Sequence, residues 1–295
     1  MILDPASLSE TSELNSDICI IGAGAAGIAL CSSLLDSNYS IILLESGDFS
    51  EEENGPFLRG RNAGSQPFSI GGQRRRVAGG MNDWSGNCSL LDKTDFDASP
   101  RFPSNWPVSF EELDKYTSKV EHFLKLDSRF SKGSLASTSS AAKVSFQDKK
   151  SPNSFLKEKT FLRSKIKVPS AQLDAITKAD SRVKIITGAS VGEINTNENR
   201  THTDSVTAVC DDKTITIRSK VVVIAAGLEN APILMRTMSQ DESEEPHPLP
   251  AVGHFLHSHL MTLQGFFIPR QGIKIKEYCL PGDLGTKGKE RAKSL

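Results

Sequence analysis

A chain of 295 residues with 37% hydrophobic content is long enough to bury a sizeable core in one large domain or two small ones. Its 35 basic and 36 acidic side chains almost cancel, so no overall field attracts nucleic acid or an anionic membrane, and we expect neither as a partner. The apolar stretches fall short of the ~20 residues that span a bilayer. The first residues are acidic and serine-rich, unlike a signal peptide, and the five cysteines are scattered without a CxxC pair. We therefore expect a soluble, cytoplasmic protein with reduced thiols.

The first predicted elements are a strand, a glycine turn and a helix. Residues 17–21 are an apolar run typical of a buried strand, and residues 28–35 continue as a helix. Between them Gly22, Gly24 and Gly27 make the pattern G-x-G-x-x-G. The first glycine permits the tight turn, the second lets the backbone approach a pyrophosphate, and the third lets the helix pack closely on the strand. We expect this turn, together with Ala25 and Ala26, to hold a dinucleotide at the helix N-terminus.

A second predicted strand, residues 40–44, ends at Glu45, eighteen residues beyond Gly27. A carboxylate at this place accepts hydrogen bonds from both hydroxyls of a ribose. The acid, with no arginine beside it, argues against a 2′-phosphate and therefore against NADP, but it does not distinguish NAD from FAD. A turn without a ligand is the weaker interpretation, because the strand, the helix and the terminal acid occur together.

Residues 46–104 form a long, glycine-rich and mostly aperiodic segment, whereas an NAD domain usually continues straight into another helix and strand. Within it, the stretch GGQRRRVAGGMNDWSGN (71–87) contains glycines that let the backbone approach a flat ligand. The arginines Arg74, Arg75 and Arg76 have two interpretations: they face the phosphates of that ligand, or they form a solvated charged surface.

Three ordered motifs in this region resemble those of a known enzyme family. Residues 78–86 are AGGMNDWSG, residues 91–96 are LDKTDF, and residues 106–116 are WPVSFEELDKY. The set resembles the glucose-methanol-choline (GMC) oxidoreductases, in the branch that includes pyranose oxidase and sugar dehydrogenases. In that family the first motif wraps the flavin. The resemblance implies FAD contacts at Arg76, Gly79, Gly80, Asn82, Asp83 and Trp84.

The sequence departs from the family pattern at Ala78, Gly80 and Asp83. Some relatives carry a histidine at the position of Asp83, and there it attaches the flavin covalently. An aspartate cannot form that bond. The resemblance therefore implies that FAD is held non-covalently.

A β-ribbon is predicted for the middle of the chain. Residues 128–160 are rich in serine and lysine, which predicts a surface excursion or linker. Predicted strands follow at residues 183–186, 190–195, 205–210 and 214–218, with a turn at Asp211 and Asp212. Proteins of the GMC family insert a small antiparallel ribbon here, and we count Val191 among the expected FAD contacts.

The segment KVVVIAAGLENAPILMRTM, from residue 220, predicts a buried strand that ends at a glycine, then a helix with Glu229 in its first turn. It resembles the returning strand of the GMC family, whose turn runs beside the dinucleotide. Family positions are kept at Ala225, Ala226, Gly227, Glu229, Asn230 and Ala231, of which Ala226, Gly227 and Asn230 are expected FAD contacts.

Three of the six histidines, His254, His257 and His259, lie within six residues. A metal site is one interpretation, but no Cys, Asp or Glu stands at ligand spacing. In the GMC family a similar segment leads from the flavin domain into the substrate domain, so we expect no metal. The remaining histidines are expected at the surface: His122, His202 and His247.

The expected fold is α/β: a Rossmann-like FAD/NAD(P)-binding domain over residues 1–250, with a parallel sheet, helices on both faces and a β-ribbon insert. Residues 251–295 are expected to begin an incomplete substrate domain. GMC proteins continue through a further sheet, a final strand and helix, and a catalytic His-His or His-Asn pair. The catalytic residues of this chain are therefore unknown.

The resemblance implies an FAD-dependent oxidoreductase that acts on the CH–OH group of a sugar or alcohol. In the family a histidine takes the hydroxyl proton while hydride passes to flavin N5. Two hypotheses stay open: an enzyme whose C-terminal half is a second polypeptide or is lost by truncation, and a flavin-binding or vestigial protein without turnover. An NAD-dependent dehydrogenase is a weaker third hypothesis, because the flavin-loop motif opposes it.

Overall fold

The computed structural model of the chain describes residues 2–3, 8–9, 11–49, 75–84, 86–88, 90–91, 93, 96, 106–126, 141–144, 159–163, 170–178, 182–199, 201–238 and 252–253. The chain divides into two compact units. One comprises Met1–Asp83 and Val168–Leu256, and the other comprises Trp84–Lys167 and His257–Leu295. The domain boundary predicted at residue 250 stays a prediction.

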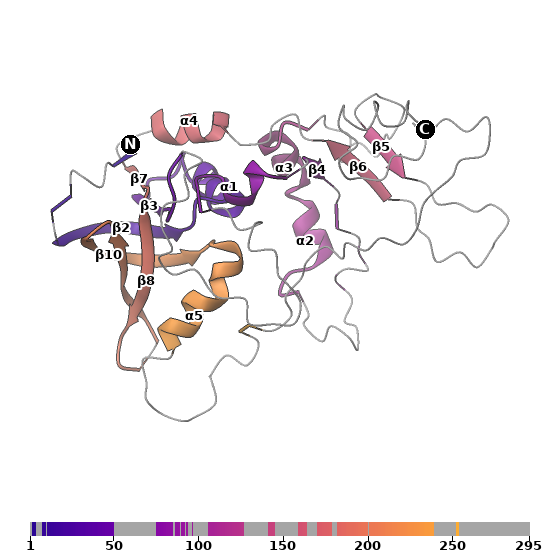
Figure 1. The fold of residues 1–295 in the computed structure, drawn as a ribbon. Coiled ribbons are helices and arrows are strands. Elements are labelled where there is room, and N and C mark those ends of the chain that lie inside the picture. Colours follow the sequence, from indigo (N-terminus) through magenta and orange to yellow (C-terminus); the bar gives the residue numbers. More distant parts are fainter. Residues whose placement is uncertain are drawn as a thin grey trace, which may run out of the picture. The chain divides into compact units, whose positions relative to one another are not determined.

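The first unit is built on a mixed sheet with the strand order β1-β7-β3-β2-β10-β9-β8 (Figure 1). Its strands are β1 (Ile2–Leu3), β2 (Thr11–Ile21), β3 (Ile41–Leu44), β7 (Val183–Ile186), β8 (Ala189–Thr196), β9 (Thr203–Cys210) and β10 (Lys213–Ile224). Strands β1, β7, β3, β2 and β10 pair in parallel, and β10, β9 and β8 form the antiparallel ribbon. The predicted α/β fold with a β-ribbon insert is confirmed.

The parallel strands end level with one another at one edge of the sheet. Pairing sets Ile21 of β2 beside Leu44 of β3 on one side and beside Ile224 of β10 on the other. Two hydrogen bonds continue this ladder past the strand ends. The Gly22 N–H donates to the Leu44 carbonyl (2.8 Å), and the Ala225 N–H donates to the Ile21 carbonyl (2.7 Å). The segments that leave β2 and β10 are therefore held side by side.

Two helices cover one face of the sheet. Helix α1 (Ala25–Ser33) follows β2, helix α4 (Ser170–Lys178) precedes β7, and the two contact each other. Alternate residues of a strand point to opposite faces. The four consecutive apolar residues of β3 are therefore buried on both faces of the sheet. Buried side chains from the helices include Ile28, Cys31 and Ile176.

The opposite face is covered by the ribbon and by helix α5 (Asn230–Met238). Cys19 and Ile42 of the parallel strands share one buried cluster with Val206 and Ile215 of the ribbon and Ile233 of α5. Strand β2 thus leads to a helix on one face and β10 to a helix on the other, as Figure 1 shows. Ligands of open α/β sheets bind at such a change of face, beyond the carboxyl ends of the strands.

The structure corrects one predicted strand pair. Residues 214–218 and the strand from residue 220 form a single strand, β10, whose length from Thr214 to Ile224 pairs with β2. Pairing with β9 ends at Ile217. Within the described part of the chain no strand pairs with this side of β10 beyond that point, and Val221 is 52% exposed. The second half of β10 is therefore less buried than predicted.

Two further boundaries differ from the prediction. Strand β2 begins at Thr11 and not at Asp17, because the polar residues before Asp17 alternate between exposed and half-buried positions as they pair with β10. Such a segment has no apolar run to reveal it. Helix α1 begins at Ala25 and not at Ile28, so Gly27 lies inside the helix.

The second unit contains a small antiparallel sheet and two short helices. Its elements are β4 (Asn87–Cys88), α2 (Phe110–Asp114), α3 (Thr117–Phe123), β5 (Ala141–Val144) and β6 (Lys159–Arg163), with the strand order β4-β6-β5. A capping box starts α2: the Glu112 N–H donates to Ser109 Oγ (3.2 Å), and the Ser109 N–H donates to Glu112 Oε2 (2.8 Å). The Phe96 ring lies 5.1 Å from Trp106 and 5.7 Å from Phe110, centroid to centroid. Most of the predicted excursion, residues 128–160, lies outside the described residues.

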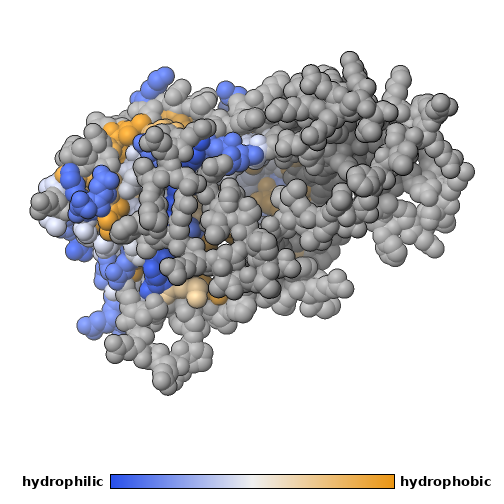
Figure 2. Space-filling model, viewed as in Figure 1, coloured by the Kyte–Doolittle hydropathy of each residue, from blue (hydrophilic) through white to orange (hydrophobic). Residues whose placement is uncertain are grey.

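The described surface is mixed in character. Figure 2 shows apolar residues between hydrophilic ones on the face that it presents. Val221, Leu228 and Met235 are among the large apolar side chains that are exposed. Among the described helices, none has the length and apolar character required to cross a bilayer.

Candidate dinucleotide site

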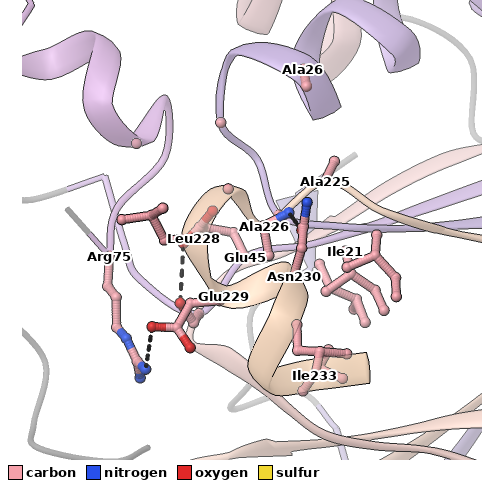
Figure 3. A pocket seen from close by; sticks show the side chains of 18 of the residues that line it. Ile21, Ala26, Glu45, Arg75, Ala225, Ala226, Leu228, Glu229, Asn230 and Ile233 are labelled. Carbon is pink, nitrogen blue, oxygen red and sulfur yellow. Dashed lines mark hydrogen bonds and ion pairs between the residues drawn. The ribbon is translucent and has the colours of Figure 1, made fainter. Parts of the chain in front are cut away.

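A cavity of about 780 Å³ lies in the first unit at the carboxyl ends of β2, β3 and β10. Its volume falls within the range of about 300–1,000 Å³ that is typical of small-molecule sites. Figure 3 shows side chains from β2, from the β3 end and from the turn before α5 that surround it. The cavity thus occupies the place where the chain changes face of the sheet.

The glycine turn after β2 forms one wall, and two of its glycines are required by close packing. Gly22 has a φ of +101°, and a Cβ there would come within 2.7 Å of the Ala225 carbonyl oxygen. A Cβ on Gly27 would come within 1.9 Å of the Gly22 carbonyl oxygen and 3.5 Å of Ile20 Cγ2. Gly27 therefore serves the predicted purpose, the close approach of α1 to β2. Neither position accepts a side chain without movement of the backbone.

The other glycines of the wall have the opposite property. Among the described residues, no heavy atom lies within 4 Å of a Cβ built on Gly24, on Gly80 or on Gly227, apart from chain neighbours and the backbone of the glycine's own helix. Gly227 has a φ of +60°. All three line the cavity. The space that their missing side chains leave is open to a ligand, which is what a close backbone approach requires.

Helix α1 begins at this wall. Gly24 is its N-cap residue, no described side chain caps it, and its first turn has no acidic residue. The first backbone N–H groups of a helix have no partner within the helix, and the helix dipole adds partial positive charge. With an open Gly24 at the same place, this end of α1 fits the charge and size of a phosphate group.

Glu45 ends β3 as predicted and is almost fully buried, with 6% of its surface exposed. Its Oε2 accepts a hydrogen bond from the Ala23 N–H of the glycine turn (2.8 Å). Its Oε1 accepts from the Gly47 N–H (2.9 Å) and from Ser46 Oγ (3.3 Å). The carboxylate is thereby fixed at the cavity wall, where each oxygen keeps lone pairs for further donors.

The segment 75–83 is tied to both of these elements. A Cβ on Gly47 would lie 1.8 Å from the Arg75 carbonyl oxygen, so this close approach requires the glycine. The Val77 N–H donates to the Asp48 carbonyl (3.1 Å), and the Ala78 N–H donates to the Ala23 carbonyl (2.8 Å). Gly47 was not among the predicted site residues, because only its contact with Arg75 shows that a glycine is required there.

The turn after β10 closes the opposite side of the cavity. Residues Gly227–Glu229 form a 3₁₀ helix, η5, and α5 follows directly. The Ala226 N–H donates to Asn230 Oδ1 (2.8 Å), which fixes the start of α5. Arg75 Nη2 lies 3.8 Å from Glu229 Oε1, and Figure 3 shows this ion pair between the two sides of the cavity.

Arg236 of α5 lines a third side of the cavity. Its Nε donates to the Gly192 carbonyl (3.0 Å), and its Nη2 donates to the Val191 carbonyl (3.4 Å). The pairing of β8 with β9 shifts register between Val191 and Glu193, so Gly192 has no partner residue on β9. Val191 and Arg236 both line the cavity.

The charged side chains of the described wall balance: Glu45 and Glu229 face Arg75 and Arg236. The nearby thiols add no charge, because burial raises the pKa of Cys19 to about 12 and that of Cys31 to about 11. A dianionic diphosphate therefore depends on α1 and on these arginines for charge compensation.

The structure brings most of the predicted cofactor contacts together. Those that line the cavity are Gly22, Gly24, Ala25, Ala26, Glu45, Gly79, Gly80, Val191, Ala226, Gly227 and Asn230. Gly27 lies beneath the turn, and Arg76, Asn82 and Asp83 are outside the described wall. Asn82 Nδ2 instead donates to the carbonyls of Val77 (3.0 Å) and Gly79 (2.7 Å) and so shapes the 3₁₀ helix η3 (Gly79–Asn82). Trp84 belongs to the second unit, and Arg74 lies outside the described residues.

No histidine lines the described part of this cavity. His122 and His202 are exposed, as predicted, and neither lines the cavity. Among the described residues no group of three or more His, Cys, Asp or Glu could hold a metal ion. The cluster of His254, His257 and His259, like His247, lies outside the described residues.

No family model and no curated protein matches the chain. The following solved structures are distantly similar to the chain. Pyridoxine 4-oxidase from Mesorbium loti is 18% identical over 75% of this chain and 52% of its own, with a TM-score of 0.48. A geranylgeranyl bacteriochlorophyll reductase-like protein from Thermoplasma acidophilum is 10% identical over 76% of this chain and 42% of its own, with a TM-score of 0.37.

L-proline dehydrogenase from P. horikoshii is 14% identical over 74% of this chain and 24% of its own, with a TM-score of 0.31. In all three comparisons the chain spans roughly a quarter to a half of the other protein. The resemblance to the GMC family therefore stays a prediction, and the site itself carries the functional argument.

Proposed function

We propose that the cavity of the first unit binds FAD non-covalently and that the chain is the cofactor-binding part of a flavin-dependent oxidoreductase. The observation that carries this proposal is the set of open glycines, Gly24, Gly80 and Gly227, around a cavity that also holds the carboxylate of Glu45. Open glycines accommodate the backbone approach of a flat, phosphate-bearing ligand. The carboxylate is suited to the ribose hydroxyls.

Two parts of a dinucleotide, the pyrophosphate and the ribose, have a suitable group in the wall. The N-terminal end of α1, with Gly24 to Ala26, suits the pyrophosphate, and Arg75 adds positive charge. A buried, negatively charged Glu45 disfavours a 2′-phosphate, which argues against NADP. The preference for FAD over NAD rests on the motif AGGMNDWSG, whose Gly79 and Gly80 line the cavity.

Non-covalent attachment is proposed because Asp83 stands where some GMC relatives carry the attaching histidine. When bound, the flavin would accept a hydride from the substrate. The substrate class we propose, a CH–OH group of a sugar or alcohol, rests on the sequence motifs alone. No general base is assigned within the described residues. We also propose, from the family resemblance, that a second polypeptide supplies the catalytic half. A flavin-binding or vestigial protein without turnover is the alternative.

The first test is the visible spectrum of the purified chain, before and after denaturation. A flavin spectrum with all of the flavin released by acid precipitation supports non-covalent FAD. Flavin that stays with the precipitate contradicts the assignment at Asp83. A colourless protein is next titrated with FAD and with NAD. Binding of NAD but not of FAD would favour the dehydrogenase hypothesis, and binding of neither would refute the proposed site.

Anaerobic addition of sugars and alcohols then distinguishes the two remaining hypotheses. Bleaching of the flavin shows that the chain oxidises its substrate alone. A stable flavin spectrum under these conditions supports a cofactor-bearing part that depends on a partner or has no turnover. Bleaching that appears only after addition of a candidate second polypeptide identifies the split enzyme.

A further inference from the structure

The ion pair between Arg75 and Glu229 joins the two sides of the cavity. Arg75 belongs to the segment packed against the β3 end, and Glu229 belongs to η5 after β10. Both side chains line the cavity, and Figure 3 shows them pointing toward each other across it. Their exposed fractions are 16% and 27%.

The backbones on both sides are fixed, so movement is left to the side chains. The Arg75 peptide is packed against Gly47, and the following residues hydrogen-bond to Asp48 and Ala23. On the other side, the Glu229 N–H donates to the Ala226 carbonyl (3.1 Å). The charged groups sit at the ends of flexible side chains on rigid supports. They can change partners without rearrangement of the sheet.

The pair is loose enough to exchange. Its N–O distance of 3.8 Å is longer than the 2.7–2.9 Å of a strong charge-assisted hydrogen bond. A partly exposed ion pair of this kind contributes little to stability. A diphosphate offers the guanidinium two negative charges and several acceptor oxygens, and arginine binds such groups in bidentate fashion. An arriving phosphate therefore competes well against Glu229.

We propose that Arg75 exchanges Glu229 for the diphosphate of the bound dinucleotide, so that Glu229 acts as an internal competitor that weakens cofactor binding. This inference rests on the proposed function. Without the dinucleotide, Glu229 pairs with Arg75 and bridges the two sides of the cavity. With it, Arg75 supplies positive charge to the phosphates. Glu229 then sets how readily the cofactor is retained or released.

The test measures the affinity of the full chain, freed of cofactor, for FAD and for ADP by titration calorimetry. Glu229→Gln removes the competitor and is expected to tighten binding of both ligands about fivefold, the factor that corresponds to an ion pair of about 1 kcal/mol. Arg75→Gln is expected to weaken binding at least tenfold, because a hydrogen bond to a charged group is lost. In the double variant the gain from Glu229→Gln should disappear, since it acts through Arg75.

Glu13→Gln is the matched control. It removes the same charge from an exposed ion pair with Arg218 that does not line the cavity, so both affinities should stay unchanged. If Glu229→Gln folds poorly, Glu229→Ala removes the same carboxylate and tests the same expectation. Far-UV circular dichroism and thermal unfolding verify that each variant is folded.

The outcomes separate this inference from the proposed function. If the wild-type chain binds FAD and ADP but Glu229→Gln and Glu229→Ala leave the affinities unchanged or weaker, the exchange is refuted and the FAD site stands. If Glu229→Gln tightens binding equally with and without Arg75, Glu229 acts by direct repulsion and the exchange is refuted. If the wild-type chain binds neither ligand, both proposals fail.

Discussion

Gly24 and Gly27 lie three residues apart, yet replacement by alanine should affect different properties. Gly27→Ala should lower stability, and Gly24→Ala should lower FAD affinity. The Cβ of Gly27→Ala would lie 1.9 Å from a backbone oxygen, where ordinary contact begins at 3.4 Å, so α1 must move away from β2 by about 1.5 Å. Overpacking of this severity costs ~3 kcal/mol. Alanine regains ~1 kcal/mol of helix propensity. The free energy of unfolding should therefore fall by about 2 kcal/mol.

The methyl group of Gly24→Ala meets no atom of the described residues within 4 Å, and the φ of −78° suits alanine. Loss of a glycine N-cap costs less than ~1 kcal/mol. The fold should persist, but the methyl group fills the space that a pyrophosphate needs, so FAD affinity should fall at least tenfold. Gly192→Ala is the control, because its nearest contact would be 3.8 Å away and it does not line the cavity.

Urea unfolding without added cofactor, followed by far-UV circular dichroism, measures the stability of all three variants. FAD titration measures affinity for those that fold. An unfolding midpoint of Gly27→Ala equal to that of the wild type would refute the packing argument. Full FAD affinity in Gly24→Ala would refute the role of the open glycine, and with it the main support for the site.

Glu45→Ala leaves the buried amide of the glycine turn without its acceptor, so urea unfolding should show a loss of about 1–3 kcal/mol together with loss of FAD binding; unchanged stability would contradict the assigned hydrogen bond. The hydrogen bond from Lys220 holds the pKa of Asp17 well below its ordinary 3.8, so the stabilisation is complete above that pH and is lost as the pH falls below it. Urea midpoints between pH 5 and 2.5 should fall less steeply for Asp17→Asn than for the wild type, and parallel curves would refute this. Burial raises the pKa of Cys19 and Cys31, so mass spectrometry should find both unmodified by a thiol reagent at pH 8 until urea is added.

The glycine turn and its surroundings were predictable because their constraints are local. A buried strand, three spaced glycines and an acid at the end of the next strand leave few alternatives, and the structure places Gly22, Gly24 and Glu45 around one cavity. The ribbon was predictable for a similar reason, since apolar strands flank the turn at Asp211 and Asp212.

Other features depend on contacts between distant segments and have no local signal. That Gly47 must be a glycine follows only from the position of Arg75, which lies 28 residues further along the chain. The ion pair between Arg75 and Glu229 joins residues that no spacing rule connects. The continuity of β10 was missed because Arg218 to Lys220 interrupts the apolar pattern, while backbone pairing with β2 carries the strand through.

Strand β10 runs from a hairpin turn of the ribbon to the cavity as a single continuous strand. Its twelve residues, at ~3.3 Å each, extend for about 40 Å from the hairpin turn at Asp211 and Asp212 to the peptide before Ala225. A slip of one residue reverses the facing of every side chain, so an insertion at this turn that shifted β10 by one residue against β2 would also displace the cavity wall. Strand β8 is a second connection of this kind, because it runs from Ala189 and Val191 at the cavity to the turn before β9. Tags, fluorophores and fusion partners meant to leave the site intact therefore belong outside both hairpin turns.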